Sequence, residues 1–156
     1  EDLDFTGDFS SCMWVNPDTV SGTDTLISKR LDAGNYQYQI RLVDGKINFL
    51  TYDSTSITDA TATVTTGSWQ FICVTYDADG NTIFYDDGSS VHTATSGAIS
   101  HVATDVFIGK SVHSDTQSYD GKIDEVRISN IALSADWIRL CYMNQKGADA
   151  LIEFDP

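Results

Sequence analysis

Two alternating segments on either side of an Asp-Gly pair constrain the fold of this chain most strongly. In residues 36–43 and 46–52, every second side chain points to the same face of an extended chain, and Asp44–Gly45 lies between the two segments. A two-residue type I′ turn needs positive φ at both central positions, so the Asp-Gly pair predicts an antiparallel hairpin. Centring the turn on this pair sets the register, in which Ile40 opposes Phe49.

The rest of the sequence is also typical of β structure. Of the 23 acidic residues, 20 are Asp and only three are the helix-favouring Glu. Both faces of residues 69–76 are apolar, which predicts a central strand covered on both sides. Further strands are expected at residues 9–15, 26–29, 82–85, 106–109 and 122–129. This spacing of strands and turns predicts an all-β sandwich or barrel.

One short helix is expected near the C-terminus. Ser134 can cap its first turn, and Asp136 suits the positive end of the helix dipole. The apolar stripe of this helix is formed by Trp137, Ile138, Cys141 and Tyr142.

Length, charge and hydropathy exclude several classes of protein. A chain of 156 residues has the usual size of one domain, so residues 1–156 are expected to form a single domain. The formal net charge of −14 excludes nucleic acid as a partner, because phosphates need Lys and Arg. The apolar runs are far shorter than the ~20 residues that cross a bilayer, so no membrane insertion is expected.

The acidic residues lack the spacing of a catalytic pair. A glycosidase of the usual kind needs two carboxyl groups about 5–9 Å apart. Asp124 and Glu125 are adjacent in the sequence, and adjacent residues on a strand point to opposite faces. The chain is therefore expected not to be an enzyme.

The three cysteines lie within apolar strand or helix patterns. Cys12, Cys73 and Cys141 are expected to be buried free thiols, which behave as small hydrophobic side chains. A disulfide between Cys12 and Cys141 stays open as an alternative, if the helix packs beside the first strand.

A series of segments runs in a recognisable order. They are FTGDFSSCMWV (5–15), TGSWQFICVTYD (66–77), IFYDDG (83–88), FIGK (107–110), and YDGKIDEVRISN (119–130) followed by LSADW (133–137). Together they resemble the laminin G-like, concanavalin A-like lectin/glucanase superfamily in its bacterial accessory-domain form. The resemblance covers nearly the whole chain and implies a two-sheet antiparallel jelly roll sandwich with one short C-terminal helix.

The resemblance also has implications for particular residues. Trp14 and Trp69 match core positions of the family. The family's usual first strand is either missing or replaced by residues 150–154.

The same resemblance implies a structural calcium ion. In the related laminarinases and lichenases, an Asp at the start of a similar late strand is a calcium ligand, and Asp124 matches that position. Asp is suitable because Ca²⁺ prefers carboxylate and carbonyl oxygens. Asp4 and Asp8 are further candidate ligands, beside backbone carbonyls near the N-terminus.

The resemblance and the absence of a catalytic pair together predict a noncatalytic carbohydrate-binding module. It would belong to a larger secreted or cell-surface protein, with covalently attached neighbouring domains, and would bind a polysaccharide or glycan. A protein-interaction or adhesion module of the laminin G-like type is the alternative.

Two surfaces are candidates for the sugar site, because sugar binding needs planar polar groups and an aromatic or apolar surface. The outward face of the first hairpin carries Gln37, Gln39, Arg41, Asn48 and Tyr52. The loop before the Asp124 strand carries His113, Asp115, Gln117 and Tyr119. An ordinary solvated sheet face and a solvated loop would show the same patterns.

Overall fold

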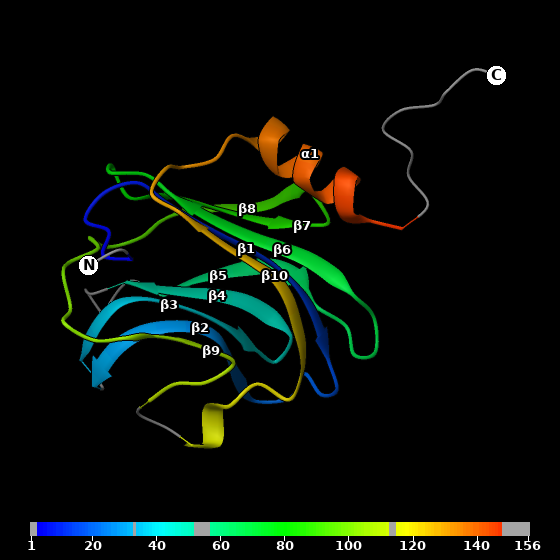
Figure 1. Ribbon diagram of the computed structural model, residues 1–156, viewed down its shortest axis with the longest axis horizontal. Coiled ribbons are helices and arrows are strands. Elements are labelled where there is room, and N and C mark those ends of the chain that lie inside the picture. The colour runs from blue at the N-terminus through cyan, green and yellow to red at the C-terminus, as the bar shows by residue number, and fades with distance from the viewer. Residues whose placement is uncertain (1–2, 33, 52–56, 113–114, 148–156) are drawn as a thin grey trace.

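The computed structural model describes residues 3–32, 34–51, 57–112 and 115–147. These residues form two five-stranded antiparallel sheets stacked face to face, with one α-helix on the outside (Figure 1). The predicted all-β sandwich with a short C-terminal helix is confirmed. The predicted replacement of the first strand, at residues 150–154, lies outside the described residues.

We name each sheet after its central strand. The β6 sheet has the strand order β10-β1-β6-β7-β8, and the β3 sheet has the order β5-β4-β3-β2-β9. The elements are β1 (Phe9–Pro17), β2 (Thr23–Asp32), β3 (Asn35–Val43), β4 (Lys46–Thr51), β5 (Ile57–Thr63), β6 (Gln70–Tyr76), β7 (Asn81–Asp86), β8 (Ser89–Thr95), β9 (Val106–Ile108), the 3₁₀ turn η1 (Asp115–Gln117), β10 (Gly121–Ser129) and α1 (Ala135–Gln145).

The β3–β4 hairpin has the predicted turn and register. Asp44 and Gly45 have φ values of 49° and 77°, as a type I′ turn requires. Ile40 opposes Phe49, and the other described pairs agree with the same register. The second Asp-Gly turn, at Asp87–Gly88, joins β7 to β8 with φ values of 47° and 76°.

The core lies between the two sheets. Phe9, Tyr38 and Phe49 are fully buried there, with ring centroids 4.6 Å apart for Phe9 and Tyr38 and 6.1 Å apart for Phe9 and Phe49. The central strand β6 places Val74 in this core and buries Phe71 on its opposite face. The prediction that this strand is covered on both sides is therefore confirmed.

Helix α1 covers the outer face of the β6 sheet. The Ser134 hydroxyl accepts a hydrogen bond from the Trp137 backbone N–H at 3.3 Å, so the predicted cap is confirmed. Ile138, Cys141 and Tyr142 pack on the sheet, and this i, i+3, i+4 spacing defines the contact face. Trp137 lies beside that face and is 54% exposed, so its expected place in the apolar stripe is wrong.

The cysteine pairing differs from both expectations. Cys12 and Cys73 form a disulfide, and Cys141 on α1 is the free cysteine. The physical reason is strand adjacency: β1 and β6 are neighbours in the sheet, and their register places Cys12 directly opposite Cys73. Cα atoms 4.0 Å apart on the same face of two strands leave the two sulfur atoms within bonding reach.

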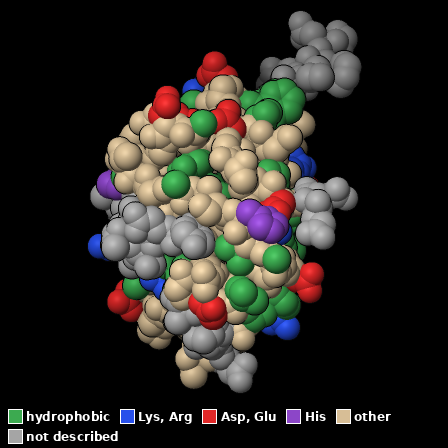
Figure 2. All heavy atoms as spheres, turned by 90° about the vertical axis from the view of Figure 1, so that its left-hand side faces the viewer, with side chains coloured by type: hydrophobic (Ala, Val, Ile, Leu, Met, Phe, Trp, Pro, Cys, Tyr) green, Lys and Arg blue, Asp and Glu red, His purple; other side chains and the backbone are tan. Residues whose placement is uncertain are grey.

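On the face shown in Figure 2, acidic side chains are scattered among hydrophobic and other side chains. Within the described ranges, α1 is too short and too polar to cross a bilayer.

Candidate functional site

Most of the described part of the hairpin face proposed from the sequence is closed to solvent, and Arg41 is half-buried. Gln37, Gln39 and Asn48 are buried. Their amides bond within the chain: Gln37 Nε2 donates to the Phe5 carbonyl at 2.6 Å, and Asn48 Oδ1 accepts from Arg41 Nε at 2.8 Å. The expected exposure of this face is therefore wrong, and a ligand would have to displace internal hydrogen bonds to reach it.

Gln39, the remaining buried amide whose partner has not been named, is also hydrogen-bonded within the chain. Gln39 Nε2 donates to the Thr25 hydroxyl at 3.0 Å on the neighbouring strand β2. Tyr52, the aromatic member of the predicted site, lies outside the described residues.

The second predicted site, the loop before β10, lies beside β2. Asp115 and Gln117 belong to the turn η1, and His113 is outside the described residues. Tyr119 packs against the core, and its hydroxyl donates to the Lys122 carbonyl at 3.4 Å. Burial, with the nearby Asp24 carboxylate, raises the pKa of the Tyr119 phenol. Tyr119 therefore serves packing at this end of the sandwich.

The three carboxylates predicted to bind calcium do not form one site. Asp4 contacts His101 and lies 3.6 Å from Lys29 Nζ, and Asp8 accepts a hydrogen bond from the Ala78 backbone N–H at 2.9 Å. Asp124 lies elsewhere, beside Trp14 of β1 in the β1–β10 register. Among the described residues, no group of three or more His, Cys, Asp or Glu could hold a metal. A site built from Asp124 and backbone carbonyls stays a prediction.

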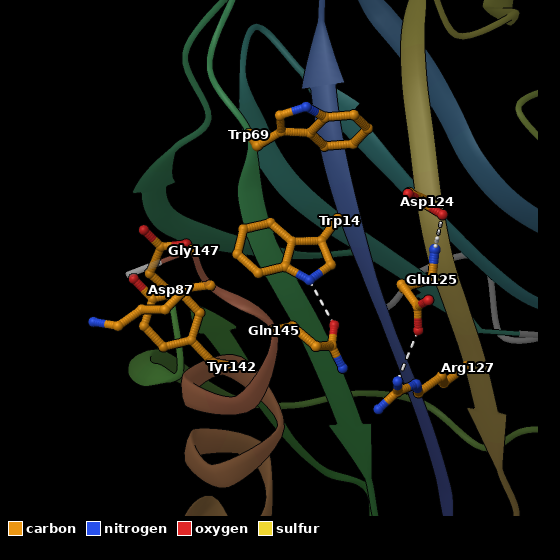
Figure 3. A pocket seen from close by; sticks show the side chains of 10 residues that line it. Trp14, Trp69, Asp87, Asp124, Glu125, Arg127, Tyr142, Gln145 and Gly147 are labelled. Carbon is orange, nitrogen blue, oxygen red and sulfur yellow. Dashed lines mark hydrogen bonds and ion pairs between the residues drawn. The ribbon is translucent and has the colours of Figure 1, made fainter. Parts of the chain in front are cut away.

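A pocket that neither sequence candidate included lies on the outer face of the β6 sheet, beside the end of α1 (Figure 3). We call it the α1 pocket. Its volume is about 680 Å³. Its lining residues come from β1, from the residue before β6, from the β7–β8 turn, from β10 and from α1 and its C-terminal cap.

Aromatic side chains form one wall of the α1 pocket. The Trp14 ring lies 5.9 Å from the Tyr142 ring and 5.5 Å from the buried Phe71 ring. Trp14 Nε1 also donates to Gln145 Oε1 at 2.6 Å, which ties the indole to α1. Trp69 extends the wall and is 43% exposed, so its expected core position is wrong.

A β-bulge brings the charged residues of β10 to the same pocket. Cys12 opposes Arg127 whereas Trp14 opposes Asp124, so β10 has one residue more than β1 over this stretch. Glu125 has a φ of 50°, which an ordinary strand residue does not adopt. The expectation that Asp124 and Glu125 point to opposite faces is therefore wrong, and both line the pocket.

The polar groups of the pocket are largely exposed. Glu125 Oε2 accepts a hydrogen bond from Arg127 Nη2 at 2.7 Å, with the two side chains 50% and 47% exposed. Asp87 lies on the opposite side of the aromatic wall (Figure 3), near Tyr142. Burial, and then the Asp87 charge, raise the pKa of the Tyr142 phenol, so it is a neutral hydroxyl at ordinary pH. The pocket thus combines aromatic faces with carboxylates, a guanidinium, an ammonium group and the side-chain amide of Gln145.

Comparison with known proteins identifies the family. Residues 1–139 match the family model described as the concanavalin A-like lectin/glucanases superfamily. The chain belongs to this superfamily. No curated protein matches the sequence significantly.

Solved structures of this superfamily fold resemble the chain at low sequence identity. A SAP-like pentraxin from Limulus polyphemus has a TM-score of 0.72 and 18% identity, over 88% of this chain and 71% of the pentraxin chain. The CBM40 of the Ruminococcus gnavus IT-sialidase, solved with α2,3-sialyllactose, has a TM-score of 0.73 and 14% identity, over 88% of this chain and 83% of its own.

A third similar structure comes from botulinum neurotoxin type C, whose cell entry depends on interaction with two ganglioside molecules. It has a TM-score of 0.65 and 17% identity, over 90% of this chain and 36% of the toxin chain. At these identities the likeness to the three structures establishes the fold alone.

Sequence analysis missed the α1 pocket, although two of its signals are local. Trp69 follows Gly67–Ser68 at the very start of a strand, where a side chain often lies at the sheet rim. The Asp124–Arg127 stretch concentrates three charges within four residues, which is unusual for a strand that faces the core on one side. Neither signal identifies the other residues with which it would form a pocket.

Proposed function

We propose that this chain is a noncatalytic carbohydrate-binding module and that its ligand binds in the α1 pocket. The observation that carries the proposal is the exposed Trp69 ring in one pocket with Trp14 and the charged residues of β10. An aromatic face accepts the C–H face of a sugar ring, while carboxylates and guanidinium groups bond its hydroxyls. The sialyllactose-bound CBM40 and the ganglioside-dependent toxin support a carbohydrate ligand in general on the shared fold, and not a particular sugar or site.

The environment of the two adjacent carboxylates supports binding without hydrolysis. The proton-donating acid of a glycosidase has its pKa raised by an apolar site. Here Glu125 is half exposed and paired with Arg127, and Asp124 accepts the Glu125 backbone N–H at 2.8 Å. We therefore expect the purified chain to release no reducing ends from polysaccharides that it binds; measurable release would refute the noncatalytic assignment.

We also propose that the module belongs to a larger secreted or cell-surface protein. The Cys12–Cys73 disulfide supports an oxidising compartment, because such bonds are rare where thiols are kept reduced. The similar structure in botulinum neurotoxin is part of a much longer chain, of which this chain spans 36%. That arrangement supports covalently attached neighbouring domains.

One observation favours protein interaction as a second function. Ile131, Trp137 and Leu140 are 54%, 54% and 44% exposed, and the first two line a separate apolar groove at the start of α1. Exposed apolar groups gathered in this way are typical of protein contact surfaces. This groove is distinct from the α1 pocket.

Two tryptophans of similar exposure provide a matched test. We expect Trp69→Ala to weaken glycan binding by about tenfold or more, the effect of truncating a central aromatic contact. Trp137→Ala should leave glycan binding unchanged, because Trp137 lines the other groove. A glycan array identifies a ligand, and titration calorimetry with that ligand measures both variants. Equal losses in both variants, or a loss in Trp137→Ala alone, would contradict the proposed site.

A further inference from the structure

The charges of the α1 pocket point to the kind of sugar that it accepts. Three carboxylates line it, from Asp87, Asp124 and Glu125, against the two cations Arg127 and Lys146. Both cations already have partners, since Arg127 donates to Glu125 and Lys146 Nζ lies 5.1 Å from the centre of the Tyr142 ring. The pocket is therefore net negative, within a chain of net charge −14.

An acidic sugar would be repelled by this arrangement. Carboxylates and sulfates are normally bound by an Arg fork or by Lys, and here the Arg127 guanidinium already donates to Glu125 at 2.7 Å. An anion that bound the remaining donors of Arg127 would lie close to the Glu125 carboxylate and be repelled by it. The uncharged hydroxyls of a neutral sugar are attracted to this pocket instead, because they can donate hydrogen bonds to exposed carboxylate oxygens such as those of Glu125 and Asp124.

The aromatic wall bears on the length of the ligand. Phe71 opposes Trp14 across β1 and β6. Trp69 lies two residues before Phe71, just outside β6, and lines the same pocket as Trp14. Its place is that of a diagonal neighbour of Trp14, a relation in which residues of paired strands lie about 7–8 Å apart. Figure 3 shows Trp69, Trp14 and Tyr142 in a row along the pocket. A single sugar ring covers one of these positions, and a chain of rings can follow the row.

We propose that the α1 pocket binds a neutral oligosaccharide of at least two sugar rings and rejects acidic glycans. The inference rests on the proposed carbohydrate-binding function and specifies its ligand class. Negative charge on β10 and in the β7–β8 turn sets the selectivity against anions, and the spaced aromatic rings set the minimum length.

Matched ligands that differ only in having a hydroxymethyl group or a carboxylate at C6 test the selectivity for neutral sugars. Mannotetraose and β-1,4-tetramannuronate share ring configuration and linkage, as do cellotetraose and β-1,4-tetraglucuronate. Calorimetry should show the neutral member of a bound pair at least about tenfold tighter, a factor that one uncompensated charge readily supplies. Added salt should weaken this preference, because it screens the repulsion. An acidic member that binds as tightly as its neutral partner would overturn the selectivity.

The length requirement is tested with the same sugars. A neutral tetramer should bind at least about tenfold tighter than its monosaccharide, since only the tetramer can reach both tryptophans. Equal affinity for the monosaccharide would overturn the two-ring claim.

Two variants separate this inference from the proposed function. Glu125→Gln removes one charge and should improve binding of the acidic tetramers relative to the neutral ones; an unchanged ratio would overturn the electrostatic argument. Trp69→Ala should weaken binding of every ligand that uses the pocket by about tenfold or more. If acidic and neutral tetramers bind equally and both need Trp69, the function stands and the selectivity is wrong. If no tetramer binds and no arrayed glycan needs Trp69, the proposed function itself is wrong.

Discussion

Replacing Gly88 with alanine tests whether the β7–β8 turn positions helix α1, which lines one side of the α1 pocket. Gly88 has a φ of 76°, and a Cβ there would lie 2.9 Å from Tyr142 Cδ1 and 3.0 Å from Tyr142 Cβ. Alanine in this left-handed conformation costs about 1–2 kcal/mol. The contact with Tyr142 adds about 1–3 kcal/mol, because the ring is held between the turn, Trp14 and Phe71 and must move with α1.

Gly22 offers a control for the backbone cost. Its φ is 86°, and an added Cβ there meets no atom within 4 Å. Urea unfolding of Gly22→Ala should therefore show only the smaller loss of about 1–2 kcal/mol in the free energy of unfolding. Gly88→Ala should lose clearly more, and should also weaken glycan binding because Tyr142 and Gln145 shift together.

A double-mutant cycle decides the cause of the extra loss. In a Tyr142→Ala background, Gly88→Ala should cost less than it does in the parent protein, because the contacts with the Tyr142 ring are gone and only the 3.0 Å contact with Cβ stays. If Gly88→Ala and Gly22→Ala are equally destabilised in the parent protein, or if the extra loss is undiminished without the Tyr142 ring, the turn does not position α1 and the reasoning is refuted.

In denaturant without reductant, a thiol reagent should titrate only Cys141, and two or three reactive thiols would contradict the disulfide. Replacing both members of Cys12–Cys73 with serine should lower the free energy of unfolding in urea by about 4 kcal/mol, because the bond joins residues 61 apart in sequence. Burial, and then the nearby Asp120, raise the pKa of Asp24, so the folded state favours the protonated form and loses stability as pH rises past the ordinary carboxyl range. Asp24→Asn should therefore raise the Tm at neutral pH but not in acid, and an equal effect at both would argue against this cause. Calcium should raise the Tm above its value in chelator, and Asp124→Ala should abolish that rise; identical melting of the parent protein in both solutions would remove the calcium prediction.

Local patterns were sufficient for much of the fold. The Asp44–Gly45 turn and the alternation around it predicted the β3–β4 register, because positive φ and period-two burial are local constraints. Ser134 predicted the start of α1 because capping depends only on the next turn. Strand β8 was not predicted, since Ser89–Thr95 has little apolar alternation and is stabilised mainly by pairing with β7.

The candidate site was predicted poorly because its residues depend on which strands become neighbours. The polar hairpin face has the alternation of a solvated sheet, yet Gln37 and Gln39 are buried with their amides bonded to Phe5 and Thr25. The order of apolar and polar residues in β10 does not reveal the bulge at Glu125. The bulge exists because β10 pairs with β1 over unequal lengths.

The amino-acid sequence alone determined the strand periodicity, the tight turns, the helix cap and the strongly acidic balance, since each of these depends on residues close together in the chain or on a simple sum of charges. Only the tertiary structure decided that Cys12 bonds to Cys73, and that Trp14, Trp69, Glu125 and Tyr142 share one pocket. These residues are far apart in sequence and meet only when β1, β6 and β10 become neighbours and α1 packs across them. The order of strands in a sheet is set by the burial of the whole core, and no short segment carries that information.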